Sequence, residues 1–163
     1  MGFPSAGMLA VGERLRQLST VRRLAPVPLF VSLGKNKETP LEAAAADYLA
    51  VLGELHDVAD AFVVNISSPN TPELRRLQTP RYLDGLLADL SAAMRLRAGL
   101  APPKPLLVKI SPELAPADLD ELLASALDNG IAAIITKPGG VGEEERYPLK
   151  RHRHLDHIAR RAG

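Results

Sequence analysis

Four short apolar segments constrain the fold of this 163-residue chain more than any other feature. They are rich in Val, Ile and Leu, and they read PLFVSLG at 28–34, AFVVNIS at 61–67, PLLVKIS at 105–111 and AAIITKP at 132–138. Each is too short to form a helix of its own. Continuous apolar runs of this kind are typical of parallel strands buried on both faces, where the alternation of polar and apolar residues is lost. The sequence therefore predicts four such strands.

Helix signals fill the segments before and after the first run. Residues 8–24 are expected to form one helix. Thr39 and Glu42 have the spacing of a capping box, and Pro40 stands between them at the first helical position. These residues predict a second helix that runs to about Leu55.

Two further helices are expected after the second and third runs. Thr79-Pro80 predicts a helix that continues to about Arg97. A third signal spans 116–130, from a proline near the start to an Asn-Gly pair at the end. Apolar residues of the 80–97 segment recur at helical spacing on one stripe: Leu83, Leu86, Leu87, Leu90 and Met94. Strands and helices thus alternate, which predicts an α/β fold built from successive βα units with parallel strands.

A single polar residue follows the apolar stretch of each run: Ser32, Asn65, Lys109 and Thr136. Ligands of parallel α/β sheets and barrels bind outside the carboxyl ends of the strands, so four polar residues at one depth favour the wall of a binding site. The alternative is that each residue only marks where its strand leaves the core. Agreement among four strands favours the site.

Lys109 stands inside the run LLVKI and has almost no polar company along its own strand. Burying an unpaired charge is costly, so Lys109 needs an anionic or electron-rich partner such as a cofactor or substrate. A carboxylate on a neighbouring strand is the alternative, but the other three runs contain no Asp or Glu. Snorkelling of the side chain to the edge of the sheet is a second alternative.

The segment VVNISSPNTPELRRLQ at 63–78 collects short hydrogen-bonding side chains directly after the second predicted strand. Amide side chains such as Asn65 and Asn70 offer donors and acceptors that suit a planar ligand with N–H and C=O groups. Pro69 stiffens the loop that also carries Ser68 and Thr71. The alternative is an Asx or Ser turn that satisfies only its own backbone.

Composition excludes several classes of protein. The net charge is +1, and three Tyr, three Phe and no Trp provide little stacking surface, so nucleic-acid binding is not expected. Cysteine is absent, which excludes disulfides and thiolate catalysis. No apolar run approaches the roughly 18 residues of a membrane span, and the first ten residues lack the pattern of a secretory signal. The chain alone is expected to be soluble.

The segment 139–163 differs in composition from the rest, with a cluster of Arg and three of the four His. His152, His154 and His157 are a weak candidate for a metal site, because no Cys and no carboxylate pair accompany them. A solvated, divergent tail is the preferred interpretation, and no metal is predicted.

The serine loop carries a resemblance to a known family. NISSPNTPELRRLQ, together with GKNK at 34–37, LLVKISPEL at 106–114 and GFPSAGMLAVGERL at 2–15, resembles the quinone-dependent class of dihydroorotate dehydrogenases in order and interval. The resemblance covers residues 2–136. It implies an FMN-dependent (βα)8 barrel that oxidises dihydroorotate to orotate in pyrimidine synthesis, passes electrons to quinone, and associates peripherally with the cytoplasmic side of the membrane.

The resemblance also implies roles for single residues. Ser68 matches the catalytic base, and Asn65, Asn70 and Thr71 match the loop that binds the substrate. Lys109 matches the lysine that contacts FMN, with Asn65 also near the flavin. The resemblance assigns two further cofactor contacts: Ser32 and Thr136.

The sequence departs from the family pattern at several positions. Ser32 stands where the family usually has Asn, and Lys137 stands in place of the Asn that follows Thr136. An eight-stranded barrel takes about 250 residues. We therefore expect a partial TIM barrel of about four βα units over 1–138, followed by the divergent basic tail at 139–163. A non-catalytic remnant of the enzyme and another FMN barrel that acts on pyrimidines are the alternative interpretations.

Overall fold

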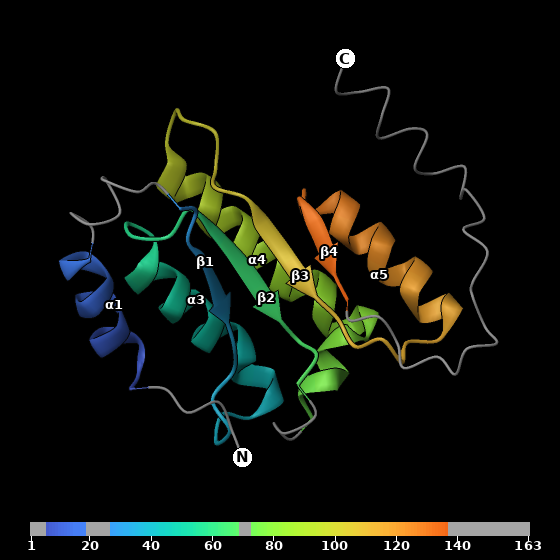
Figure 1. The fold of residues 1–163 in the computed structure, drawn as a ribbon. Coiled ribbons are helices and arrows are strands. Elements are labelled where there is room, and N and C mark those ends of the chain that lie inside the picture. Colours follow the sequence, from blue (N-terminus) through green and yellow to red (C-terminus); the bar gives the residue numbers. More distant parts are fainter. Residues whose placement is uncertain (1–5, 19–26, 69–72, 137–163) are drawn as a thin grey trace.

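The computed structural model describes residues 6–18, 27–68 and 73–136. Four parallel strands form one sheet in the order β1-β2-β3-β4, which is also their order in the chain (Figure 1). The strands are β1 (Phe30–Leu33), β2 (Ala61–Asn65), β3 (Leu106–Lys109) and β4 (Ala133–Ile135). The predicted arrangement of about four βα units with parallel strands is confirmed.

Burial of the strands differs from the prediction. All five residues of β2 are buried, but β1 alternates between exposed and buried residues, and β4 has no fully buried residue. The prediction of strands buried on both faces is therefore wrong for β1 and β4. The reason is their position, because within the described residues each of them has only one neighbouring strand.

Helices cover one face of the sheet (Figure 1). They are α1 (Met8–Gln17), α3 (Ala44–Leu55), α4 (Pro80–Ala98) and α5 (Pro116–Asp128), with short 3-10 helices η1 (Leu41–Ala43) and η2 (Leu74–Gln78). Helix α1 ends at Gln17, so the prediction of a helix to residue 24 falls partly on residues outside the described ranges. The other predicted helix ends agree with the structure within two residues.

The start of the second predicted helix is different. Pro40 is the N-cap of η1, which continues into α3, and no side chain caps either helix. The prediction of a capping box at Thr39 and Glu42 is wrong. The Thr39 carbonyl accepts a hydrogen bond from the Lys35 ammonium, so this turn is organised from the preceding loop.

The main core lies between the sheet and the helices. The predicted stripe of α4 is buried, with Leu83, Leu87 and Leu90 fully covered. These side chains pack with the helix-facing residues of the strands, among them Leu33 and Val64. A smaller apolar cluster on the opposite face of the sheet consists of Ala61, Val63 and Leu107, with Ile135 packed against it.

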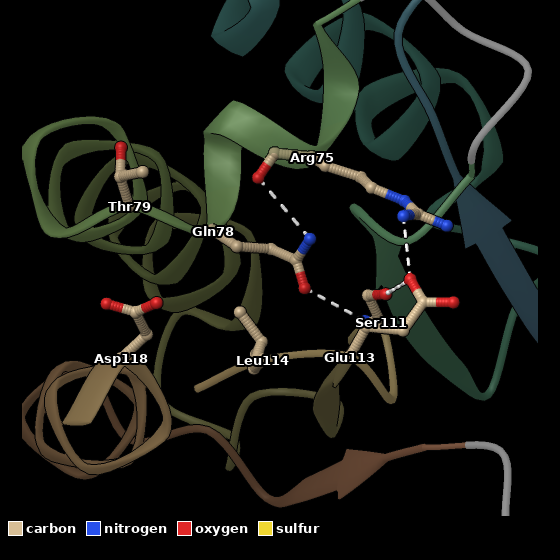
Figure 2. Close-up of a pocket in the computed structure, with 7 residues that line it drawn as sticks. All are labelled: Arg75, Gln78, Thr79, Ser111, Glu113, Leu114 and Asp118. Carbon is tan, nitrogen blue, oxygen red and sulfur yellow. Dashed lines mark hydrogen bonds and ion pairs between the residues drawn. The ribbon is translucent and has the colours of Figure 1, made fainter. Parts of the chain in front are cut away.

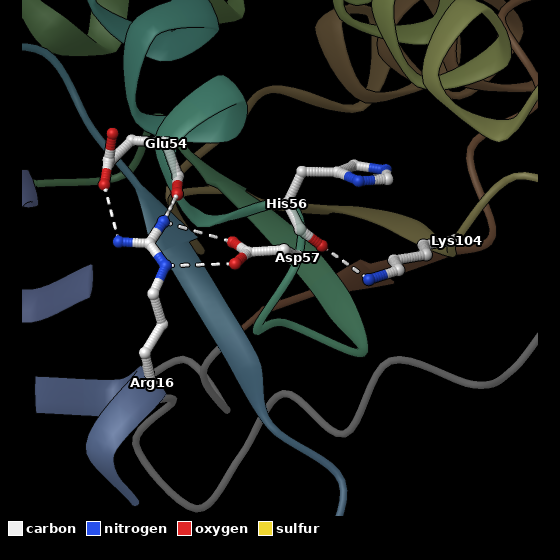
Figure 3. A network of polar contacts seen from close by, with 5 residues as sticks. All are labelled: Arg16, Glu54, His56, Asp57 and Lys104. Carbon is white, nitrogen blue, oxygen red and sulfur yellow. Dashed lines mark hydrogen bonds and ion pairs between the residues drawn. The ribbon is translucent and has the colours of Figure 1, made fainter. Parts of the chain in front are cut away.

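Polar contacts join the elements at the amino-terminal ends of the strands (Figure 3). Arg16 of α1 pairs with Glu54 at 2.9 Å and with Asp57 at 3.0 Å, which ties α1 to the end of α3. Lys104 donates to the carbonyls of His56 and Ala59 just before β2. These contacts lie at the amino-terminal ends of the strands, whereas the predicted site lies at their carboxyl ends.

Candidate functional site

The face of the sheet that the helices leave uncovered carries most of the predicted site residues. Side chains alternate along a strand, so Ser32, Asn65 and Lys109 fall on the same face as the small cluster of Val63 and Leu107. This uncovered face of the sheet, called the inner face below, therefore carries both apolar and polar residues. The apolar residues lie toward its middle and the polar residues toward the carboxyl ends of the strands.

Asn65 and Lys109 are register partners at the ends of β2 and β3. Lys109 is half-buried rather than buried, which corrects the prediction for its side chain. Within the described part of the chain, its ammonium makes no hydrogen bond or ion pair with another side chain. A partly buried cation in this setting suits an anionic or electron-rich ligand.

The Asn65 side chain organises the start of the serine loop. Its Oδ1 accepts hydrogen bonds from the Ser67 backbone N–H at 3.2 Å and from the Ser67 hydroxyl at 3.0 Å. The turn that the sequence offered as an alternative to a binding loop is thus present. It uses only the acceptor of the amide, and the Nδ2 group makes no hydrogen bond to a described residue. The turn orients Asn65 and leaves a donor for a ligand.

Tyr48 holds the same strand end from the helix side. Its hydroxyl donates to the Asn65 carbonyl at 2.9 Å, and its side chain is fully buried. Burial raises the pKa of the Tyr48 phenol well above its usual value, so the hydroxyl stays protonated as a donor. The sequence analysis missed this residue. Its spacing of four from Ala44 and from Leu52, both buried in α3, was a usable signal.

Ser68 is 6% exposed and lies just past the Asn65 turn. Burial of a hydroxyl at the end of a strand suits a group that works in a water-poor site. The predicted substrate-binding residues Asn70 and Thr71 lie outside the described residues.

The four polar residues do not lie at one depth. Ser32 pairs with Val63, two residues before Asn65, and Thr136 is exposed and follows the last residue of β4. The prediction of one depth holds for Asn65 and Lys109. It is wrong for Ser32 and also for Thr136, because the residue that pairs with Lys109 is Ile135. In β1 the polar residue Ser32 comes earlier relative to the pairing of the strands. That pairing depends on contacts with the neighbouring strand, which the sequence of a single run does not contain.

A second polar cluster joins the segments that follow β2 and β3 (Figure 2). The Gln78 side chain is 3% exposed, accepts from the Ser111 N–H at 2.9 Å, and donates to the Arg75 carbonyl at 3.3 Å. The Arg75 guanidinium pairs with Glu113 at 2.7 Å. Gln78 was not predicted from the sequence. It directly follows Leu77 in a segment of regularly spaced apolar residues, and a polar residue at such a position usually has a buried hydrogen-bond partner.

A cavity of about 230 Å³ opens beside this cluster. It is lined by Arg75, Gln78, Thr79, Ser111, Glu113, Leu114 and Asp118 (Figure 2). None of the predicted site residues that the structure describes lines this cavity, and its volume is smaller than the roughly 300 Å³ at which small-molecule sites begin. The inner face of the sheet therefore remains the candidate site.

The described residues contain no group of three or more His, Asp or Glu side chains that could hold a metal ion. The candidate metal ligands of the tail lie outside those residues. The structure has a parallel sheet with helices on one face. An amide, an ammonium and a buried hydroxyl lie at or just after the carboxyl ends of its strands. These features define a protein of the βα-barrel type with a polar ligand site.

Comparison with known proteins narrows this class to a family. The family model described as dihydroorotate dehydrogenase matches residues 1–154. The dihydroorotate dehydrogenase (quinone) of Anaeromyxobacter sp. (strain Fw109-5) is 46% identical over 153 residues, which are 93% of this chain and 41% of that protein. The dihydroorotate dehydrogenase (quinone) of Thermus thermophilus is 50% identical over 124 residues, which are 76% of this chain and 33% of that protein.

A solved structure supports membership of the same family. DHODH from Eimeria tenella in complex with ferulenol superposes with a TM-score of 0.74 at 29% identity, over 83% of this chain and 41% of that one. The chain therefore belongs to the dihydroorotate dehydrogenase family, and it spans 41% or less of the length of the relatives named here. The family match extends past Pro138, and the division of the chain at residue 138 stays a prediction.

Proposed function

We propose that this chain carries the catalytic base and one wall of the flavin site of a quinone-dependent dihydroorotate dehydrogenase. Such an enzyme oxidises dihydroorotate to orotate in pyrimidine synthesis. The observation that carries the proposal is the register pair of Asn65 and Lys109 on the uncovered face, with the buried Ser68 three residues after Asn65 in the chain. Family membership supplies the reaction, and this pair supplies groups that suit it.

FMN fits the donor set of this wall. The isoalloxazine ring offers carbonyl oxygens and a ring nitrogen along one edge, which suit the Lys109 ammonium and the Nδ2 group of Asn65. When bound, FMN accepts a hydride from the substrate. The ammonium of Lys109 would supply a positive charge that favours the anionic reduced form of the flavin. Ser32 lies on the same face and Thr136 follows β4, and both are proposed as further contacts.

Ser68 takes the proton that leaves the substrate. A serine hydroxyl is a poor base by itself, so the proton must pass on through a hydrogen-bonded relay. Burial of Ser68 keeps the group away from bulk water and strengthens the electrostatic interactions that assist the transfer. Asn70 and Thr71 are proposed to bind the substrate together with Asn65.

Quinone is the proposed electron acceptor, and the proposed location is the cytoplasmic side of a membrane, to which the whole enzyme binds peripherally. Among the described residues, no helix has both the length and the apolar character needed to cross a bilayer. Nucleic acid is not a proposed partner.

Titration of the purified chain with FMN tests the cofactor site. Saturable binding is expected, measured by quenching of flavin fluorescence, and Lys109→Met is expected to weaken it by about tenfold or more, as loss of a charge-assisted contact does. Arg95→Met is the matched control, because Arg95 is an exposed cation on α4 of the helix layer. Equal affinity of the Lys109→Met and Arg95→Met proteins would refute the role of Lys109.

Absence of FMN binding to the wild-type chain would instead favour the non-catalytic alternative. In that case the inner face and the sheet edges at β1 and β4 are left as surfaces for another protein segment. Dye reduction that depends on dihydroorotate distinguishes the two cases, because only the enzyme produces it.

A further inference from the structure

Two neighbouring residues of helix α3 bind the segments at the carboxyl ends of two strands. The Asp47 carboxylate accepts a hydrogen bond at 2.7 Å from the N–H of Asn36, in the loop that follows β1. The next residue, Tyr48, donates from its hydroxyl to the Asn65 carbonyl at 2.9 Å, at the end of β2. Helix α3 therefore connects both strand ends on the side of the sheet where the site is proposed.

The bond from Tyr48 is the more deeply buried of the two. Asn65 is 5% exposed and Tyr48 is fully buried in the core, whereas Asp47 is only partly buried. A buried carbonyl that loses its donor has no water molecule to replace it, so the loss is costly. The Tyr48 hydroxyl therefore holds the Asn65 carbonyl in one direction.

The direction of the Asn65 carbonyl controls the turn that begins at the same residue. Rotation about the bond between Cα and the carbonyl carbon of Asn65 turns the carbonyl, and it moves the Ser67 N–H at the same time. That N–H and the Ser67 hydroxyl both donate to Asn65 Oδ1, in the manner of an Asx turn. Because Oδ1 is engaged, the Nδ2 group is the part of the amide that is left to donate to a ligand.

We propose that Tyr48 is a positioning residue, which fixes the Asn65 carbonyl from the core and thereby directs the Asn65 Nδ2 group into the site on the inner face of the sheet. The orientation of Asn65 is a property of the fold, whereas the use of Nδ2 as a donor to FMN rests on the proposed function. Tyr48 belongs to the core between the sheet and the helices, and it acts only through Asn65.

Amide hydrogen exchange by NMR tests the orientation without ligand and without turnover. Tyr48→Phe keeps the ring and removes only the hydroxyl. The Ser67 N–H reports on the turn at Asn65. The Phe62 N–H, which donates to the Pro105 carbonyl at 3.0 Å at the other end of β2, reports on general opening of the strand. In Tyr48→Phe, Ser67 is expected to exchange roughly five- to tenfold faster than in the wild type, beyond any change at Phe62.

Asp47→Ala is the matched control on the same helix. It removes the acceptor of the Asn36 N–H and leaves the Tyr48 hydroxyl in place, so faster exchange is expected at Asn36 and not at Ser67. Equally fast exchange of Ser67 in Asp47→Ala and in Tyr48→Phe would overturn the proposal, because any loosening of α3 would then have the same effect.

Ser91→Ala is the control for general destabilisation. It removes a buried hydrogen bond to the Asn129 carbonyl in the helix layer, and it is expected to change Ser67 and Phe62 by the same factor. An equal change of these two amides in Tyr48→Phe would also overturn the proposal. If Tyr48→Phe does not fold, it is combined with Gly85→Ala, which adds a helix-favouring methyl group in open space on α4, and the same expectation holds.

A second arm uses FMN, with binding measured by quenching of flavin fluorescence. Tyr48→Phe is expected to weaken FMN binding by about three- to tenfold when Asn65 is present, and to have no effect in the Asn65→Ala background, because Tyr48 acts only through that side chain. An equal loss in both backgrounds, or no loss when Asn65 is present, would refute the role of Tyr48 in binding. Failure of the wild-type chain to bind FMN would refute the proposed function but leave the exchange result as it stands.

Discussion

Tyr48 joins helix α3 to the carboxyl end of β2 through a single buried hydrogen bond to the Asn65 carbonyl. On the other side, the Asn65 side chain accepts two hydrogen bonds from Ser67. Single residues thus determine where the end of β2 lies and which groups of Asn65 remain for a ligand. Two predictions concern contacts at this scale.

Tyr48→Phe is expected to lower the free energy of unfolding by about 1–2 kcal/mol, because it removes the donor and leaves a buried carbonyl less well satisfied. Urea denaturation measures this change. Tyr82→Phe is the matched control, since Tyr82 is partly exposed and its ring contacts with Arg76 and Arg81 do not need the hydroxyl. A loss that is equal in the two variants would contradict the role of the Tyr48 hydroxyl.

His56 predicts a pH dependence of stability. Burial lowers the pKa of His56, the positive charges of Lys104 and Arg97 lower it further, and Asp57 opposes them. Its buried Nε2 has no hydrogen-bond partner among the described residues, and its ring stacks on Phe62. A depressed folded-state pKa means that the unfolded chain takes up the proton first as the pH falls.

The contribution of neutral His56 is therefore complete above the ordinary histidine pKa near 6.5 and is lost as the pH falls below it. Urea titrations from about pH 7.5 to about pH 5.5 are expected to give a falling free energy of unfolding. His56→Gln is expected to reduce that slope, because the side chain no longer titrates. An unchanged slope in the variant would show that other groups cause it.

Individual elements are fixed by close packing and by contacts with distant segments. Helix α1 packs on α3 at Gly12, where an added Cβ would lie 3.0 Å from Glu54 Oε1 and 3.1 Å from a Leu55 methyl group. Leu55 is buried and Glu54 is paired with Arg16, so neither moves freely. Glycine is present here because the two helices approach closely.

Gly12→Ala is therefore expected to leave stability unchanged or to lower it by up to about 1 kcal/mol, despite the better helix propensity of alanine. Gly85→Ala is the matched control on α4, because an added Cβ meets no atom within 4 Å. This control is expected to raise the free energy of unfolding by roughly 0.5–1 kcal/mol. Equal stabilisation by the two changes, in thermal and urea unfolding, would show that the helices have room at Gly12.

The apolar stripe of α4 gives a second prediction for an element. Leu87→Ala is expected to lower the free energy of unfolding by about 2–5 kcal/mol, because Leu87 is fully buried between helix and sheet. Leu96→Ala changes a leucine of the same helix that is 84% exposed, and less than about 0.5 kcal/mol is expected. Similar losses in the two variants would contradict the assigned face of the helix.

At the scale of the whole molecule, the order and direction of the strands follow from the sequence. Four apolar runs separated by helix signals are enough to predict four parallel strands, and the stripe of α4 is enough to predict its buried face. The offset of Ser32 is not predictable in this way, since register depends on pairing between β1 and β2. Burial of β1 and β4 depends on how many strands flank them.

The site shows the same division. Asn65 and Lys109 stand out in the sequence because they are polar residues at the ends of apolar runs, whereas Ser68 is singled out only by the family resemblance. Gln78 and Tyr48 do not stand out, because their partners are 33 and 17 residues away. Thr39 and Glu42 have the spacing of a capping box, but Lys35 bonds to the Thr39 carbonyl and the helix begins as a 3-10 turn. Long-range partners therefore decide what local patterns leave open.

We propose that Ser68, three residues after the end of β2, removes a proton from dihydroorotate beside a flavin held by Lys109. Anaerobic mixing of the FMN-loaded chain with dihydroorotate tests this most directly, with flavin absorbance as the measure. The wild-type protein and Ser91→Ala, a control that changes a buried serine of helix α4, are expected to lose flavin absorbance. Ser68→Ala is expected to bind FMN as the wild type does but to be reduced at least about 100-fold more slowly. Reduction of Ser68→Ala at the wild-type rate, or no reduction of the flavin bound to the wild-type chain, would contradict the account.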